Sequence, residues 1–307
     1  MTSSTSLPSW LKQLYHYDSH FVRLGRWNCH YLDEGEGEPV VMVHGNPAWS
    51  FMYRHLVDGL RDRFRVVVPD HIGCGLSDHP GGEGYSYTLE QRARDLEQLL
   101  DALQLNQPVS LVVHDWGGLI GCAYAIRYPS RISRMVVLNT AAFHLPPGKD
   151  LNRILRWCRS SRLAAFMILR LNFFSWAATN LGMRMRRMPR LVRKAYRYPY
   201  CNARDRQAVL SFIQDIPLSH EDPSYQMVSR IEAGLTRLRD KPMLLCWGEL
   251  DPVFDPDFLR EWQRRFPGAF VQKFTRGGHY ILEDAHEAIV PLVREFLEAP
   301  VKKNDAP

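Results

Sequence analysis

An aspartate between a run of β-branched residues and two glycines is the residue most suited to covalent chemistry. Val112-Val113 lead through His114 to Asp115, and Trp116-Gly117-Gly118 follow. This order predicts a nucleophile elbow, a tight strand-to-helix turn that lifts one side chain out of a sheet toward a substrate. The usual motif places serine there, whereas a carboxylate can attack a carbon that carries a leaving group and form an alkyl ester. The segment therefore favours carbon–halogen, epoxide or strained-ring substrates over peptides and ordinary esters.

A histidine and an acid late in the chain could assist this nucleophile. His279 follows two glycines just after the last predicted strand, and we expect it to serve as a base toward water. Asp251 follows the predicted strand 243–247 and is the expected acid that orients the histidine, with Glu249 and Asp255 as nearby alternatives. The order nucleophile, acid, histidine is that of the α/β-hydrolase fold.

Two neutral donors could hold the negative charge that develops as a leaving group departs. Asn46 lies in the loop His44-Gly45-Asn46-Pro47 after the first core strand, where such a fold forms part of its oxyanion hole. Its side-chain amide and the indole N–H of Trp116 both donate hydrogen bonds. Together they suit a halide or a departing carboxylate. We expect His44 and His114 to support the loops in which they lie.

The composition indicates a soluble globular protein and argues against bound cofactors. The chain has 307 residues, of which 45% are hydrophobic and 23% charged, enough for one large α/β domain with an insertion. No apolar run approaches the ~18 residues that cross a bilayer, and the start at 1–6 lacks the pattern of a signal peptide, so we expect a cytoplasmic location. The six cysteines and the histidines form no metal-binding spacing, and the Gly-x-Gly at 73–75 is no dinucleotide fingerprint.

Short apolar runs alternate with helical patterns, which is typical of βαβ units and a mostly parallel sheet. The runs show little polar alternation, so we expect helices to cover both faces of the sheet. Strands are predicted over 40–43, 65–69, 109–113, 135–138, 243–247 and 270–274. Helices are predicted over 49–60, 89–103 and 118–128.

The pattern changes after Thr140. Residues 144–219 contain no strand-like run and are helical, basic and aromatic. The sequence therefore predicts an α/β core over 1–143 and 220–307, with a helical cap over 144–219 inserted between two core strands. The apolar stretches of the cap either pack internally or roof an apolar pocket between cap and sheet.

Positive charge is concentrated inside this cap. The net charge is +6, and seven basic residues fall between Arg184 and Arg197. They form either a solvated helix face or a docking surface for an acidic partner protein, an acyl carrier or anionic lipid. Nucleic acid is not expected, because no recognised binding module accompanies the charge.

Taken together, these motifs resemble the haloalkane dehalogenase branch of the α/β hydrolases over residues 31–297. The matching segments are 44–47, 70–73, 114–118, the acid at 251 and the Gly-His pair at 278–279. The resemblance implies an α/β-hydrolase fold, a mostly parallel sheet with an inserted cap. Some members place the acid after the strand that precedes the cap, but Leu138-Asn139-Thr140 has no carboxylate there. The resemblance therefore implies the triad Asp115, Asp251 and His279.

The same resemblance implies that Asn46 and Trp116 form a halide-binding pair. Within this branch the chain is most similar to the β-lactone decarboxylases of bacterial olefin biosynthesis, in the third subfamily. That similarity rests on 139–143, 187–189, 195–196, 199–200, 214–219 and 279–284. It implies a hydrophobic cis-3,4-dialkyl β-lactone as substrate, converted to a long-chain alkene and carbon dioxide. It also implies a partner, the lactone-forming synthetase, which could bind the basic cap.

Several alternatives stay open at this point. Asp115 could attack the ring carbon or the carbonyl of a lactone. The same five residues could instead hydrolyse haloalkanes through water activated by His279. Epoxide hydrolysis would draw on the cap tyrosines at 196, 198 and 200, although Asn46 is atypical for that chemistry. A receptor that binds a ligand without turnover is the remaining alternative, because a fold by itself decides no function.

Overall fold

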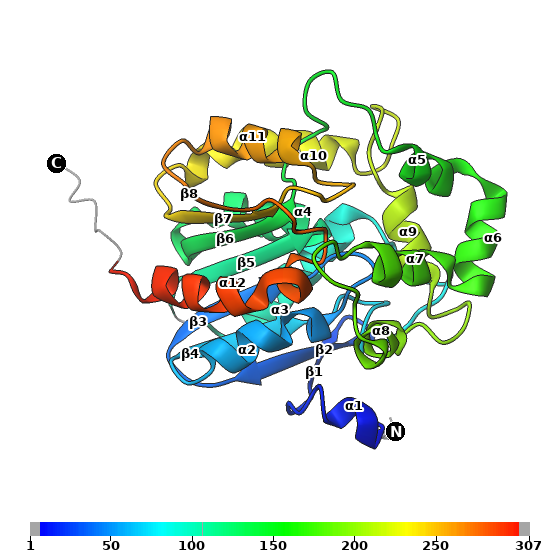
Figure 1. The fold of residues 1–307 in the computed structure, drawn as a ribbon, viewed down its shortest axis with the longest axis horizontal. Coiled ribbons are helices and arrows are strands. Elements are labelled where there is room, and N and C mark those ends of the chain that lie inside the picture. Colours follow the sequence, from blue (N-terminus) through cyan, green and yellow to red (C-terminus); the bar gives the residue numbers. More distant parts are fainter. Residues whose placement is uncertain (1–6, 106, 301–307) are drawn as a thin grey trace.

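An eight-stranded sheet lies at the centre of the computed structural model, which describes residues 7–105 and 107–300 (Figure 1). Its strand order is β1-β2-β4-β3-β5-β6-β7-β8. Every pair from β4 to β8 is parallel, and β1 and β2 add to the β4 edge in antiparallel fashion. The strand bounds are β1 His20–Leu24, β2 Trp27–Glu34, β3 Glu38–Val43, β4 Phe64–Pro69, β5 Val109–Asp115, β6 Ile132–Thr140, β7 Met243–Gly248 and β8 Phe270–Phe274.

Helices cover both faces of this sheet and build a separate group beside it (Figure 1). The α-helices are α1 Ser9–Lys12, α2 Arg54–Leu60, α3 Leu89–Ala102, α4 Trp116–Arg127, α5 Arg153–Ser160, α6 Arg162–Leu171, α7 Phe173–Leu181, α8 Arg190–Arg197, α9 Gln207–Gln214, α10 Tyr225–Gly234, α11 Pro256–Arg265 and α12 Ile281–Glu298. The 3₁₀ helices are η1 Ser50–Tyr53, η2 Pro129–Arg131 and η3 Leu235–Leu238.

Two apolar cores lie on opposite faces of the sheet. Neighbouring residues of a strand alternate between them, so Val112 belongs to the core under α2 and α12, and Val113 to the core under α3, α4, α10 and α11. Because both faces are covered, β3, β5 and β6 have almost no exposed side chain. The apolar runs of the sequence are therefore explained by burial on both sides.

Five helices, α5 to α9, lie between β6 and β7 in the chain and form the group beside the sheet edge where the parallel strands end (Figure 1). They fall inside the region that we assign to the cap, although its limits at 144 and 219 stay a prediction. Part of the group has its own small core around Ile168, Tyr200 and Val209. The Tyr200 hydroxyl donates to Ala48 O (2.9 Å) and the Trp49 indole to Ala195 O (3.1 Å), which ties these helices to the sheet loops.

The six predicted strands are all present, with three differences from expectation. β1 and β2 were not predicted, because their antiparallel edge position allows polar residues such as Arg23 and Asp33 to face solvent. β8 was expected to be covered on both faces, which is wrong, because it is the outer strand and is largely exposed. The helix expected at 49–60 begins as the 3₁₀ turn Ser50–Tyr53 and becomes α-helical only at Arg54.

The sequence also led us to expect no signal peptide, no membrane span and no metal site. The start at 1–6, from which we predict no signal peptide, lies outside the described residues. Within 7–105 and 107–300, no helix is both long and apolar enough to cross a bilayer. Over the same ranges, no three His, Cys, Asp or Glu side chains gather in a way that could hold a metal ion.

Candidate active site

Asp115 is the last residue of β5, and its backbone has a positive φ that is typical of a tight turn. Its φ is 51°, in the left-handed region that L-residues rarely adopt, and helix α4 begins at the next residue. Two glycines make room for this turn. A Cβ on Gly45 would lie 2.0 Å from Asp115 Oδ1, and one on Gly117 would lie 1.9 Å from Val43 O. The predicted elbow is therefore present, and Gly45 and Gly117 allow the neighbouring backbone and the Asp115 side chain to pack closely.

The two carboxylate oxygens of Asp115 have different surroundings. Oδ1 accepts a hydrogen bond from the backbone N–H of Asn46 at 2.6 Å, and the backbone N–H of Trp116 also donates to the carboxylate. Oδ2 lies 3.8 Å from Nε2 of His279, which is too long for a hydrogen bond. One oxygen is thus fixed while the other is left facing the histidine.

His279 is held in place from both sides. Its Nδ1 donates to Oδ2 of Asp251 at 2.8 Å, and Oδ1 of Asp251 in turn accepts from the Val253 N–H at 2.7 Å. On the other side, Nε2 of His114 donates to the carbonyl of His279 at 2.8 Å. Asp115, His279 and Asp251 therefore lie in one row, and His114 supports the loop of His279, whereas we expected it to support only its own loop.

Burial and charge act against each other on these three groups. Burial raises the pKa of Asp115, although His279 and the two N–H donors oppose it. Burial disfavours the charged form of His279, but Asp251 and Asp115 outweigh it and raise its pKa to about 9. The pKa of Asp251 is lowered, because His279 and backbone donors outweigh its burial. The positive charge of His279 therefore stabilises the ionised forms of both Asp115 and Asp251, and the two carboxylates stabilise the charged imidazole in return.

The two expected anion donors lie next to this carboxylate, but they also contact the cap helix α9. The Asn46 side chain donates from Nδ2 to Val209 O at 3.1 Å, and its Oδ1 is buried without a partner among the described residues. The Trp116 ring packs against Phe212 with centroids 5.3 Å apart. Asn46 and Trp116 thus join the core to α9.

A cavity of about 480 Å³ opens in front of Asp115, between the sheet loops and the cap helices. Asn46, Trp116 and His279 line its floor together with Asp115. Most of its wall residues are aliphatic or aromatic, although Lys149, Arg184 and Asp255 also line it. The apolar ones include Leu119, Phe143, Phe174, Ile213, Val228 and Phe258. Such a cavity suits an apolar ligand whose polar atoms are confined to the floor.

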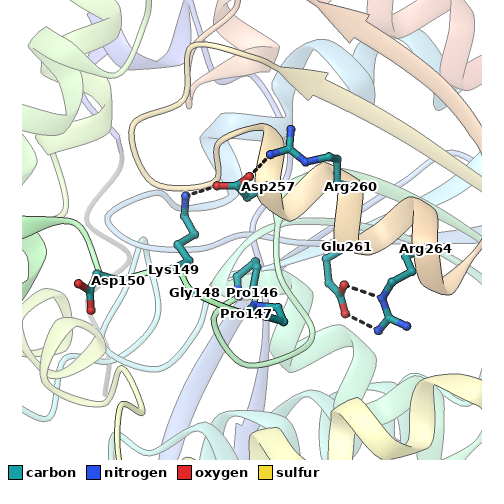
Figure 2. A pocket seen from close by; sticks show the side chains of 9 residues that line it. All are labelled: Pro146, Pro147, Gly148, Lys149, Asp150, Asp257, Arg260, Glu261 and Arg264. Carbon is teal, nitrogen blue, oxygen red and sulfur yellow. Dashed lines mark hydrogen bonds and ion pairs between the residues drawn. The ribbon is translucent and has the colours of Figure 1, made fainter.

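A second hollow, of about 500 Å³, lies beside the loop at 146–150 and one face of α11, and Figure 2 shows its side chains. Its charged groups are occupied with one another. Lys149 pairs with Asp257 (3.0 Å) and Glu261 with Arg264 (2.7 Å), and Arg260 also pairs with Asp257. Because these charges neutralise one another, we assign no function to the hollow.

The alternatives weighed for the acid and for epoxide chemistry are not supported by the geometry. Glu249 pairs with Lys273 (3.2 Å), and Asp255 caps α11 and pairs with Lys149, so neither reaches His279. Among the cap tyrosines, the Tyr196 hydroxyl donates to Glu283 (2.8 Å) and that of Tyr200 to a backbone carbonyl. None of the three is among the residues that line the cavity.

The backbone N–H of Asn46 binds the Asp115 carboxylate, and a backbone N–H from this loop was expected as part of the oxyanion hole. Three other contributors to the site were not predicted. The Val209 carbonyl and the Phe212 ring support the anion donors from the cap, and the Phe254 ring stacks near His279 with centroids 6.0 Å apart. No motif marks these residues, because each acts through a contact that only the folded chain creates.

Comparison with known proteins agrees with this geometry. A family model described as alpha/beta hydrolase fold matches residues 38–286. A cis-3-alkyl-4-alkyloxetan-2-one decarboxylase of Shewanella oneidensis is 48% identical over 94% of this chain and 90% of its own length. A protein of the same name from Xanthomonas campestris pv. campestris is 46% identical over 87% and 91%.

Haloalkane dehalogenases are more distant relatives. Haloalkane dehalogenase 2 of Mycobacterium tuberculosis is 34% identical over 92% of this chain and 96% of its own length. The crystal structure of the haloalkane dehalogenase DatA from Agrobacterium tumefaciens superposes with a TM-score of 0.81 at 24% identity, covering 91% and 96% of the two chains. With the family model spanning most of its sequence and with relatives of this similarity, the chain belongs to the α/β hydrolase fold family.

Proposed function

We propose that this protein is a β-lactone decarboxylase, which converts cis-3,4-dialkyl oxetan-2-ones into cis-alkenes and carbon dioxide. The observation that carries the proposal is a buried carboxylate with one oxygen unbound, at the floor of an apolar cavity. Two relatives at 46 and 48% identity bear the name of that activity, which favours a lactone over a haloalkane.

In the proposed mechanism, Asp115 opens the strained ring through Oδ2. Attack on ring carbon 4 forms a carbon–oxygen bond and breaks the ring carbon–oxygen bond, which leaves an alkyl ester and a free carboxylate. The electron pair of the bond to that carboxylate then forms the double bond, carbon dioxide departs, and the ester bond breaks to regenerate the Asp115 carboxylate. Attack at the carbonyl would instead break the acyl–oxygen bond of the ring and give an anhydride with an alkoxide on carbon 4. That alkoxide would then attack the Asp115 carbonyl of the anhydride, which forms the same alkyl ester and frees the substrate carboxylate. Neither route consumes water.

Asn46 and Trp116 are proposed to hold the carboxylate that leaves the ring carbon. Both lie at the cavity floor beside Asp115, and both can donate a hydrogen bond from a neutral group. Donors that are already in place where charge develops stabilise a transition state without reorganisation. The Asn46 amide has two hydrogens, so the bond to Val209 O leaves one of them for the substrate.

His279 would have different tasks in the two reactions. In a dehalogenase a neutral imidazole takes a proton from water once the aspartate is esterified. The lactone reaction consumes no water, and there His279 would stabilise the Asp115 carboxylate through its positive charge. Haloalkane hydrolysis by the same residues is the alternative that an experiment has to separate.

The test gives the purified protein a cis-dialkyl β-lactone and, separately, 1-bromobutane. We expect alkene by gas chromatography from the lactone and little bromide from the haloalkane. The same lactone reaction in oxygen-18 water should leave the Asp115 carboxylate unlabelled when the protein is digested and weighed. Bromide release without alkene, or oxygen-18 in Asp115 after lactone turnover, would contradict the proposal.

Two further expectations of the sequence remain proposals. A lactone-forming synthetase is the partner that the resemblance implies, and residues 184–197 are a candidate surface for it, in competition with the lipid surface considered below. A cytoplasmic location is the other. Neither enters the chemistry proposed for Asp115.

A further inference from the structure

The cap carries all of the excess positive charge of this protein. Residues 151–203 contain twelve Lys and Arg and no Asp or Glu. Of the 39 basic residues in the chain, 27 therefore lie elsewhere, together with all 33 acidic ones, so the remainder is net negative. The segment spans α5 to α8, on the side of the molecule away from β8 and the C-terminal end of α12 (Figure 1).

Many of these cationic groups are free to meet another surface. Six arginines of the segment are exposed and have no acidic partner among residues 7–105 and 107–300. They are Arg153, Arg162, Arg170, Arg184, Arg187 and Arg190. Because the segment itself contains no carboxylate, Arg156, Arg159 and Arg186 find their acidic partners in other segments, at Asp150, Asp222 and Glu287. The cap is therefore a cationic surface with little internal neutralisation.

Large apolar side chains are exposed on the same surface. Of the twelve that are exposed in the described part of the chain, nine lie between residues 154 and 191. On α6 the solvent side carries Leu163, Phe166 and Leu171 together with Arg162 and Arg170, while Ala164 and Ile168 face inward. Exposed patches of this kind mark a surface that contacts something apolar.

The reaction cavity opens within this patch. Ile154 and Leu181 line the cavity and are also 63 and 57% exposed, so they form its rim. Trp176 and Met185, which are near Leu181 in the chain, are exposed as well, and Arg184 is both exposed and part of the cavity lining. A ligand that enters the cavity therefore passes over a surface that is both apolar and cationic.

We propose that the α5–α8 face of the cap docks onto anionic lipid bilayers, so that apolar substrate enters the cavity directly from the membrane. Arginines interleaved with Trp, Phe and Leu on surface helices fit the boundary between anionic headgroups and acyl chains. A protein interface would instead gather its apolar residues at a centre with charges at the rim. The substrate part of the inference depends on the proposed function, whereas the docking part does not.

Vesicle sedimentation tests the docking without any lactone. We expect the purified protein to sediment with phosphatidylglycerol-containing vesicles, to sediment less with pure phosphatidylcholine, and to be released by salt, because screening weakens the contact. Substituting Arg162→Gln, Arg170→Gln and Arg187→Gln together should weaken binding on the order of 10²-fold. Leu163→Ser with Phe166→Ser should also release the protein.

Matched controls come from the core strands. Phe21→Ser and Phe270→Ser change side chains that are 56 and 66% exposed on β1 and β8, and they should bind vesicles like the native chain. Circular dichroism melts confirm that each variant is folded. Failure of the native chain to bind, binding equally lost in the controls, or full binding by both cap variants would overturn the proposal. If the native chain does not bind vesicles but forms a dimer, and the cap variants are monomers, then this face binds a second copy of the chain instead.

Discussion

The two halves of the site differ in what holds them. Asp115, His279 and Asp251 are fixed by contacts within the sheet loops, including the Asn46 N–H and the Val253 N–H. The anion donors Asn46 and Trp116 contact cap helix α9. Asn46 donates a hydrogen bond to the Val209 carbonyl, and Trp116 packs against the Phe212 ring. The core thus sets the nucleophile and its charge balance, while the cap can adjust how a leaving group is held.

The largest effect should come from the core half. Asp115→Ala removes the carboxylate that forms the covalent intermediate, so lactone turnover should fall on the order of 10⁴-fold or more. Alkene formation by gas chromatography measures it. Asp115→Asn is the matched control for shape, and it should be equally inactive. Substantial activity in either variant would mean that another group attacks the ring.

The anion half should respond less strongly. Asn46→Ala removes one donor to the departing carboxylate and should lower kcat on the order of 10²-fold, with a smaller change in KM. Trp116→Phe tests the other donor with an aromatic ring retained. If both variants keep native kcat, other groups hold the departing carboxylate, and Asn46 and Trp116 are not the anion donors of the site.

The pH profile distinguishes the role of charge in the core half. The raised pKa of Asp115 means that its carboxylate is lost as pH falls through that value, so lactone turnover should drop about tenfold per pH unit below it. From neutral pH to about 9 the rate should be level, because His279 keeps its charge there. A rate that instead climbs steadily up to pH 9 would point to His279 as a base toward water.

The smallest effect should come from the cap support of the anion donors. Phe212→Leu keeps an apolar side chain but removes the ring against Trp116, so binding of a carboxylate or halide should weaken about three- to tenfold. Quenching of tryptophan fluorescence by bromide reports it. The pH profile of turnover should stay unchanged. A shifted pH profile would show that the cap also governs the core half.

The sequence predicts the triad in the sheet loops better than it predicts the contacts from the cap. Asp115, Asp251 and His279 lie at strand ends, and the carboxyl ends of parallel strands meet at one edge, so their meeting could be inferred. Val209 and Phe212 lie in a helix whose pattern predicts only packing, and nothing in it indicates where α9 docks. The exposure of β8 and the presence of β1 and β2 were missed for a similar reason, because an edge position is a property of the whole sheet.

The turn at Asp115 has a consequence for the stability of the whole protein. A non-glycine residue at φ 51° costs on the order of 1–3 kcal/mol, and a carboxyl whose pKa is raised by burial stabilises the fold less once it ionises. Both costs are present before any substrate binds. An Asp115→Gly chain should therefore melt at a higher temperature than the native one. At this single residue the protein has lower stability in return for catalytic activity.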